Sequence, residues 1–182
     1  MCMLILGLST SQSKARSIEN TNICNPSGKP LFNLVQSLTL AKYYVKYMKE
    51  KFMSSRIQSS HCPVVECAKN ALNFTIDTTT NINSIKEDMT TFQAIRWVIN
   101  EMRRSEADLF YIEILNNLKI AVNNALSSLG KILISCRNQP TEPSLHQPLC
   151  PAERLEERYF RGCTLLNQIE HIISESEQKY EA

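Results

Sequence analysis

The sequence is poor in glycine, with only four glycines among 182 residues, and it contains a single tryptophan. A chain built from many tight β-turns needs more glycine than this, so a hairpin-rich β architecture is disfavoured. No stretch approaches the roughly 18 consecutive apolar residues that span a bilayer, which argues against membrane insertion. The composition favours one all-α domain, and the 43% hydrophobic content suits a sizeable core.

Strong charge and the usual signatures of catalysis are also missing. The formal net charge is only +2, so neither nucleic acid nor an anionic membrane is an expected partner. The three histidines, His61, His146 and His171, share no metal-ligand spacing, and there is no glycine-rich loop suited to phosphate. We therefore expect neither an enzyme nor a cofactor.

Cysteine, by contrast, is plentiful, with seven in the chain. When Cys2 is set aside in the N-terminal apolar stretch, an even number remains, as in secreted domains held together by disulfides. The remaining cysteines are Cys24, Cys62, Cys67, Cys136, Cys150 and Cys163. The count alone leaves open the alternative of buried, reduced thiols in an intracellular protein.

The N-terminus resembles the end of a secretory leader, because an apolar core gives way to small polar residues. We assign residues 1–13 to this leader, which is short and lacks a basic segment, so either translation begins upstream or the export signal is weak. Residues 14–29 then form a polar tail that carries Cys24. Asn73 begins the one usable N-glycosylation sequon, Asn-Phe-Thr. These features predict a secreted glycoprotein.

Four stretches carry apolar residues at the three- and four-residue spacing of amphipathic helices. They are residues 30–55, 82–103, 105–135 and 152–179. Ser105 followed by Asp108 predicts a capping box at the start of the third helix. One continuous helix over 82–135 stays open as an alternative, because no glycine or proline separates the two stretches. A helix of that length is uncommon, which favours the break.

The lengths of the connections predict the topology. Links of roughly 26 residues before the second helix and roughly 16 residues after the third can each cross a bundle from end to end, at up to about 3.3 Å per residue. The link between the second and third helices is too short to do so, which makes them antiparallel neighbours. We therefore predict an all-α, long-chain four-helix bundle with up-up-down-down topology and two long crossover loops. Long loops between antiparallel helices are the alternative.

The first predicted helix carries two candidate binding features on its surface. Lys42, Lys46 and Lys49 form a basic stripe. A solvated face is the simplest interpretation, and electrostatic steering towards an acidic receptor or a glycosaminoglycan is the alternative. Exposed aromatic side chains on the same helix would be candidate binding hot spots. They are Tyr43, Tyr44 and Tyr47.

A set of cysteines and short motifs is shared with a known family. The set comprises the tail residue Cys24, the segment Leu38-x-Leu40-Ala41-Lys-Tyr-Tyr-Val-Lys-Tyr, two cysteines in the first long loop, Cys136 at the end of the third helix, a proline-rich second loop, and Arg161-Gly162-Cys163-Thr-Leu165-Leu166 in the fourth helix. Together these features resemble the interleukin-6 family of cytokines, and within it the branch of leukaemia inhibitory factor and oncostatin M with their fish relatives.

The resemblance implies a secreted, monomeric four-helix cytokine. Such a ligand clusters class I receptors of the glycoprotein 130 type and signals through receptor-bound Janus kinases and STAT factors. The resemblance also implies a disulfide between Cys24 and Cys136. A second would join Cys62 or Cys67 of the first loop to Cys163, and Cys150 would take the loop cysteine that remains.

The resemblance further implies two receptor contacts. The glycoprotein 130 contact, on the outer faces of the first and third helices, maps to Lys42, Lys46, Lys49, Asn117 and Asn124. The second signalling receptor of this branch is gripped by Phe-x-x-Lys at the start of the fourth helix, whereas this chain has Glu156 and Tyr159 at those positions. Leu155 with Arg158 is the nearest analogue, one residue out of register. Leu155, Arg158 and Tyr159 are therefore the candidate second contact.

Two alternatives to this interpretation remain open from the sequence. One is a reduced intracellular helical adaptor that uses the same apolar stripes to bind partner helices. The other is a different long-chain helical cytokine, such as an interleukin-12 alpha subunit or a prolactin-like hormone.

Overall fold

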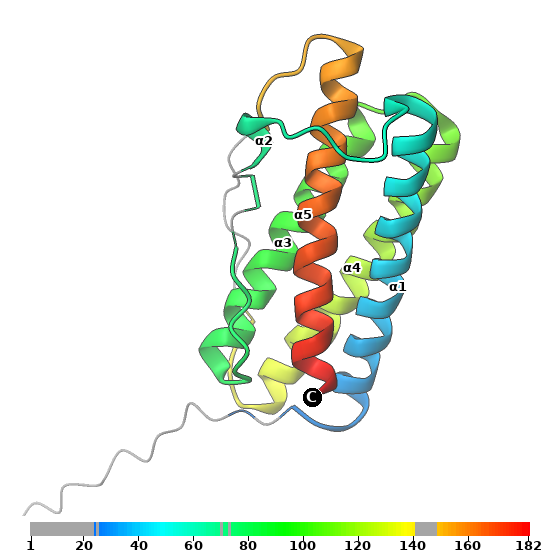
Figure 1. The fold of residues 1–182 in the computed structure, drawn as a ribbon. Coiled ribbons are helices and arrows are strands. Elements are labelled where there is room, and N and C mark those ends of the chain that lie inside the picture. The colour runs from blue at the N-terminus through cyan, green and yellow to red at the C-terminus, as the bar shows by residue number, and fades with distance from the viewer. Residues whose placement is uncertain (1–23, 25, 70, 73, 141–148) are drawn as a thin grey trace, which may run out of the picture.

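The computed structural model describes residues 24, 26–69, 71–72, 74–140 and 149–182 (Figure 1). These residues form α-helices and no strand. The long helices are α1 (Gly28–Phe52), α3 (Ile82–Arg104), α4 (Leu109–Ser135) and α5 (Leu155–Glu181), and α2 (Glu66–Lys69) is a single turn. The all-α prediction is confirmed, and the arrangement is compatible with a helical bundle.

Each long helix buries the apolar stripe that its sequence spacing predicts. On α1 the buried positions include Leu34, Leu38, Ala41, Val45, Met48 and Phe52. α4 packs against both α1 and α3, and α1 also packs along α5. Burying a Leu, Ile or Phe side chain contributes about 1.5 to 3 kcal/mol, so these stripes hold the helices together.

Contacts between helices fix their directions. Lys42 of α1 contacts Glu177 of α5, and Lys49, seven residues later, contacts Glu170, seven residues earlier, so α1 and α5 are antiparallel. The start of α3 meets the end of α5 through another ion pair. In Figure 1, α1 and α3 accordingly begin at the lower end of the molecule, and α4 and α5 begin at the upper end.

The break between α3 and α4 lies where the sequence favoured one, but the capping prediction for Ser105 is wrong. Ser105 follows the last turn of α3, and its hydroxyl donates to the Met102 carbonyl oxygen (2.9 Å). Asp108 is the N-cap of α4 and accepts from the Phe110 N–H (2.9 Å). The carboxylate of Glu106 accepts the backbone N–H groups of the two residues that follow it, which stabilises the link as a turn. α4 therefore starts at Leu109 instead of 105.

The first and fourth helices also differ in their bounds from 30–55 and 152–179. α1 begins at Gly28, whose positive φ of 71° suits a glycine, and it continues past Phe52 as a π-helical turn, Met53–Ile57. α5 begins three residues later than predicted. Its N-cap is Arg154, whose N–H donates to Glu157 (3.2 Å).

Three cysteine pairs lie at disulfide distance: Cys24 with Cys136, Cys62 with Cys163, and Cys67 with Cys150. Their Cα separations of 5.8, 5.4 and 5.8 Å suit disulfide bonds. The first pair ties the N-terminal tail to the end of α4. The other two tie the loop between α1 and α3 to α5 and to the segment before it. The family resemblance had left the partner of Cys163 open, and the structure pairs it with Cys62.

Some predicted features lie outside the described residues. They are the leader at residues 1–13, most of the tail at 14–29, and the glycosylation site Asn73. Within the part of the chain that is described, no helix combines the length and the apolar character needed to cross a membrane.

Candidate functional site

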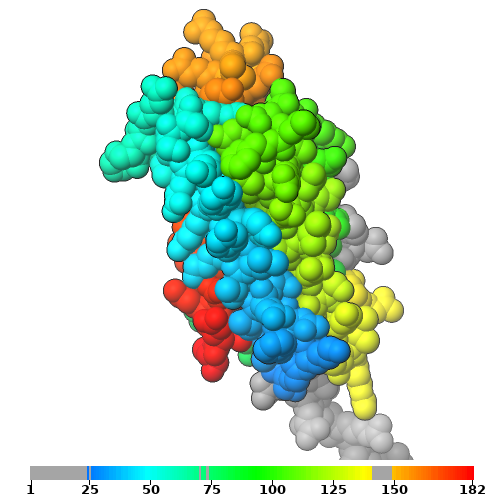
Figure 2. All heavy atoms as spheres, turned by 90° about the vertical axis from the view of Figure 1, so that its right-hand side faces the viewer, coloured from blue at the N-terminus to red at the C-terminus, as the bar shows by residue number. Residues whose placement is uncertain are grey.

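Exposed apolar side chains gather on the outer face shared by α1 and α4, which lie side by side in Figure 2. Phe32 is 64% exposed and Tyr43 59%, and Leu40 of α1 and Ile120 of α4 are exposed as well. Single exposed apolar residues are common on soluble proteins, but a cluster of large ones marks a binding surface. We call Phe32, Leu40, Tyr43, Ile120 and Asn124 the α1–α4 surface.

A shallow groove of about 510 Å³ lies on this surface. Its walls include Phe32, Val35, Leu40 and Tyr43 from α1, and Asn124 from α4 faces them. Grooves that combine aromatic walls with a few polar groups are typical of protein contact sites. The structure therefore brings the predicted contact residue Asn124 next to the predicted hot-spot residue Tyr43.

Aromatic rings continue the α1–α4 surface towards the start of α4. Tyr43 stacks with Tyr47 at 6.2 Å between ring centroids, and Tyr47 meets the edge of Phe110 at 6.3 Å. Tyr44 and Tyr47 are half-buried, so of the three tyrosines singled out in the sequence only Tyr43 is fully available. Sequence reasoning missed Phe32 and Leu40. The only sequence signal for either residue was a large apolar side chain at a position outside the apolar stripe that is buried.

Two of the three lysines of the basic stripe form ion pairs with α5. Lys42 donates to Glu177 (2.5 Å), and Lys49 donates to Glu170, so both lie along the seam between α1 and α5. Lys46 is exposed and pairs with no carboxylate among the described residues. The basic stripe is therefore not a simple solvated face, and it does not form part of a surface with α4. Its acidic partners come from α5, and the sequence of α1 alone could not reveal them.

The ion pair at Glu177 predicts an acid-dependent loss of stability. Burial alone would raise the pKa of Glu177, but hydrogen bonds from Lys42 and Thr39 (2.7 Å), with the charge of Lys46, lower it below the ordinary 4.5. This stabilisation is present above about pH 4.5 and is lost as the pH falls through the lowered pKa. Glu177→Gln should cost about 1 to 2 kcal/mol at neutral pH and little near pH 3, measured by urea unfolding.

The exposed residue Glu181 supplies the control for this measurement, since Glu181→Gln should change stability little at either pH. An equal loss for Glu177→Gln at both pH values would show that the ion pair does not stabilise the fold.

A second concavity, of about 370 Å³, lies where the end of α1, the link between α3 and α4, and the start of α5 meet. Leu155, Arg158 and Tyr159 all line it, so the structure brings the three candidates at the start of the fourth helix to one place. Apolar side chains of the other helices line it too: Met48, Phe52, Met102 and Leu115. We call this concavity the α5 pocket.

Arg56 is one of the residues that line the α5 pocket, and it packs among three aromatic rings. Its guanidinium carbon is 3.9 Å from the ring centroid of Tyr111, 4.5 Å from that of Tyr159 and 5.1 Å from that of Phe52. Two of its nitrogens donate to the two carboxylate oxygens of Glu106 at 2.7 and 2.9 Å. Burial lowers the pKa of Arg56, but the hydrogen bond and charge of Glu106 outweigh it, so the guanidinium stays protonated.

Sequence reasoning missed both Arg56 and Glu106, which are fifty residues apart. Arg56 fell in a stretch where helical periodicity fades, because the chain there forms a π-helical turn. Such turns often occur at functional sites and redirect side chains that regular helix would place elsewhere. A lone arginine near the end of an amphipathic helix gave no signal of this role.

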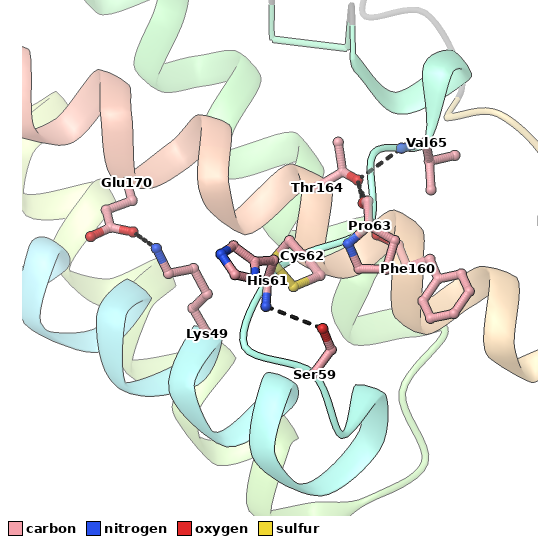
Figure 3. Close-up of a disulfide and its surroundings, with 10 residues drawn as sticks. Lys49, Ser59, His61, Cys62, Pro63, Val65, Phe160, Thr164 and Glu170 are labelled. Carbon is pink, nitrogen blue, oxygen red and sulfur yellow. Dashed lines mark hydrogen bonds and ion pairs between the residues drawn. A yellow bond between two sulfur atoms is a disulfide. The ribbon is translucent and has the colours of Figure 1, made fainter.

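The loop after α1 is strapped across α5 (Figure 3). The Thr164 hydroxyl donates to the Pro63 carbonyl oxygen (2.9 Å) and accepts from the Val65 N–H (3.2 Å). The adjacent residue, Cys163, forms the disulfide with Cys62. The strap holds the first turns of α5 in place, so it also fixes the wall of the α5 pocket.

Gly162 allows α5 to approach the end of α1. A Cβ added at Gly162 would lie 3.1 Å from the Phe52 ring, closer than nearly all real contacts of that kind. A side chain at position 162 would therefore push the Phe52 ring away from α5.

The described residues contain no group of three or more His, Cys, Asp or Glu side chains that could hold a metal ion. Comparison with protein-family models, curated proteins and solved structures finds no match to the chain.

Proposed function

We propose that the protein is a secreted cytokine, similar to the interleukin-6 family, that binds and clusters class I receptors of the glycoprotein 130 type. Receptor clustering would activate Janus kinases and STAT factors. The observation that carries the proposal is the α1–α4 surface, a cluster of exposed aromatic and aliphatic side chains on a disulfide-bridged helical domain.

The fold supports this proposal through its connections. We take the four long helices as a long-chain bundle with up-up-down-down topology, in which two long loops link parallel pairs and a short link joins α3 to α4. This arrangement leaves the outer faces of α1 and α4 adjacent. A receptor can therefore contact both helices at once.

The cysteine pairs support the extracellular part of the proposal. Three disulfide-like pairs are consistent with an extracellular protein, because disulfides persist mainly in oxidising compartments. An intracellular adaptor would keep these thiols reduced. Within the proposal, the bridges stabilise a domain whose long loops cross the whole bundle.

The structure narrows the residues proposed for the glycoprotein 130-type contact. Asn124 stays in the proposed contact, Asn117 is half-buried on the same helix, and Phe32, Leu40 and Tyr43 join it. Lys46 leaves the contact, because its charge acts on Glu177 of α5. Lys42 and Lys49 are reassigned to holding α5 against α1. Aromatic side chains provide most of the energy in many interfaces, so Phe32 and Tyr43 are the proposed hot spots.

Binding to receptor ectodomains tests this assignment. The wild-type chain should bind an immobilised glycoprotein 130-type ectodomain, measured by surface plasmon resonance. The double variant Phe32→Ala/Tyr43→Ala should bind at least about thirtyfold more weakly, since each hot-spot truncation costs about 1 to 2 kcal/mol or more. Both side chains are exposed, so the fold should be kept.

The control for the binding test is His171→Ala, which changes an exposed side chain on α5 and should bind like the wild type. Equal affinity of the double variant and the wild type would refute the assigned surface. No binding of the wild type to any ectodomain of this receptor class would refute the proposed function.

A further inference from the structure

The α5 pocket combines an apolar floor with a cationic rim. Met48, Phe52, Met102 and Leu115 supply apolar lining from α1, α3 and α4. The rim on α5 carries Arg158 and Arg161, one helical turn apart. Cavities of this size with a few polar groups around an apolar floor suit binding of a side chain or a small ligand.

The two rim arginines pair with no carboxylate among the described residues. Nε of Arg158 donates to the Ala152 carbonyl oxygen (3.1 Å), and Arg161 donates to the Cys150 carbonyl oxygen. Neither forms an ion pair in the described part of the chain. Burial and the nearby charge of Arg158 lower the pKa of Arg161, and the charge of Glu101 only partly offsets them, so the two cations repel each other. An incoming carboxylate would relieve that repulsion.

The acidic groups of the pocket are already engaged elsewhere. Glu106 binds Arg56 with both oxygens and accepts two backbone N–H groups. Asp108 caps α4 and lies 3.5 Å from Arg56. Glu101, whose charge reaches Arg161, pairs with Arg104, and Glu157 accepts the Arg154 N–H. Because each of these carboxylates is engaged by another group, Arg158 and Arg161 keep their positive charge without an ion-pair partner on the rim.

We propose that the α5 pocket receives an apolar side chain of the second signalling receptor that is flanked by a carboxylate, with the apolar group on the floor and the carboxylate between Arg158 and Arg161. This inference rests on the proposed function and deepens its second contact. The family resemblance implied a phenylalanine projecting from the cytokine, and this chain has Glu156 there. The pocket reverses the roles, since the receptor supplies the apolar group.

A protein segment fits this site better than a small molecule. Leu155 borders the pocket and is 59% exposed, so the apolar surface continues out of the cavity onto the face of α5. A ligand confined to the cavity would leave Leu155 in water. A receptor segment would cover it, and the charge complementarity of an acidic segment matches the arginine rim.

Filling the pocket tests the inference directly. Ala107 lines the pocket and is exposed, so Ala107→Trp should block it without removing a buried side chain. Affinity for the ectodomain of the second receptor, of the leukaemia inhibitory factor or oncostatin M type, should fall at least about tenfold, as should that of Arg158→Gln/Arg161→Gln. Affinity for glycoprotein 130 should not change. The matched control Gln178→Trp, at an exposed position near the other end of α5, should alter neither affinity.

A probe that needs no receptor provides the second measurement. In NMR titrations of the wild-type chain, N-acetyl-leucyl-aspartate should shift the amide signals of Ala107, Arg158, Arg161 and Gly162, whereas N-acetyl-leucyl-lysine amide should not. Shifts with neither dipeptide, or equal shifts with both, would overturn the inference even if Ala107→Trp failed to fold.

The outcomes separate this inference from the proposed function. Glycoprotein 130 binding with unchanged second-receptor affinity in Ala107→Trp would overturn the inference alone. Selective binding of the acidic dipeptide without any effect on receptor affinity would overturn the receptor as the occupant. A chain that binds no receptor of this class would refute both.

Discussion

Replacing Lys179 with methionine is expected to lower the free energy of unfolding by about 3 to 5 kcal/mol, the cost of breaking a buried ion pair on one side. Lys179 and Asp88 have side chains only 0% and 2% exposed, and Nζ lies 2.7 Å from a carboxylate oxygen of Asp88. The Tyr180 hydroxyl donates to the same oxygen. Lys179→Met would leave the carboxylate buried with a single hydroxyl donor, at the point where the end of α5 meets the start of α3.

The loss in Lys179→Met should depend on pH. Burial already raises the pKa of Asp88 in the native protein despite hydrogen bonds from Lys179 and Tyr180, and removing the ammonium should raise it further. A carboxyl whose folded pKa is raised stabilises the fold in its protonated form, so the variant should lose stability as the pH rises from about 4 towards 7.

Urea unfolding of three variants separates the ion pair from side-chain packing. The double variant Asp88→Asn/Lys179→Met should recover to within about 1 kcal/mol of the wild type, because no charge remains buried. Lys131→Met, at an exposed position, should change stability by less than about 0.5 kcal/mol. If Lys179→Met were as stable as Lys131→Met, the end of α5 would not depend on this pair.

Removing the bridge between Cys24 and Cys136 is expected to cost more than removing either of the other two. The Cys62–Cys163 and Cys67–Cys150 bridges are nested, with sequence separations of 101 and 83, so each closes an effective loop of only 18 residues while the other stays intact. Loops of that size predict a loss of about 3 kcal/mol. Cys24 and Cys136 close a much longer path, and the double alanine variant should lose about 4 kcal/mol.

Thermal unfolding of the three double alanine variants measures this order. Removing both nested bridges should cost more than the sum of their separate losses, because the second removal opens a far longer loop. Peptide mapping without reductant should first find all six cysteines of the secreted wild-type protein paired as in the structure. Six free thiols would contradict the extracellular assignment.

The helices could be predicted from the sequence, because a helix that buries one face repeats its apolar residues at the spacing of the helical turn. On the longest predicted helix, the apolar residues at helical spacing include Tyr111, Leu115, Leu118, Val122 and Leu129, and all are buried in α4. The end of that helix was also predictable, since Cys136 precedes a proline-rich stretch. The start was not, because the backbone N–H groups after Glu106 are taken by its own side chain in preference to a Ser105 cap.

The candidate site was only partly predictable, because its contacts join residues from distant parts of the chain. The hot-spot character of tyrosine identified Tyr43 as a candidate and resemblance identified Asn124, but only the packing of α1 beside α4 brings them together. The pairing of Arg56 with Glu106, and the ion pairs that turn Lys42 towards α5, depend on which helices become neighbours. A single helix's sequence contains no such information.

STAT phosphorylation in cells that express defined receptor pairs tests the central proposal most directly. The purified, disulfide-bonded chain should induce it in cells that carry a glycoprotein 130-type receptor with a second signalling receptor of the same class. It should induce none in matched cells that lack these receptors, and Phe32→Ala/Tyr43→Ala should need a much higher concentration. Absence of STAT phosphorylation with every pair of such receptors, from a protein that is folded and fully bridged, would contradict the account.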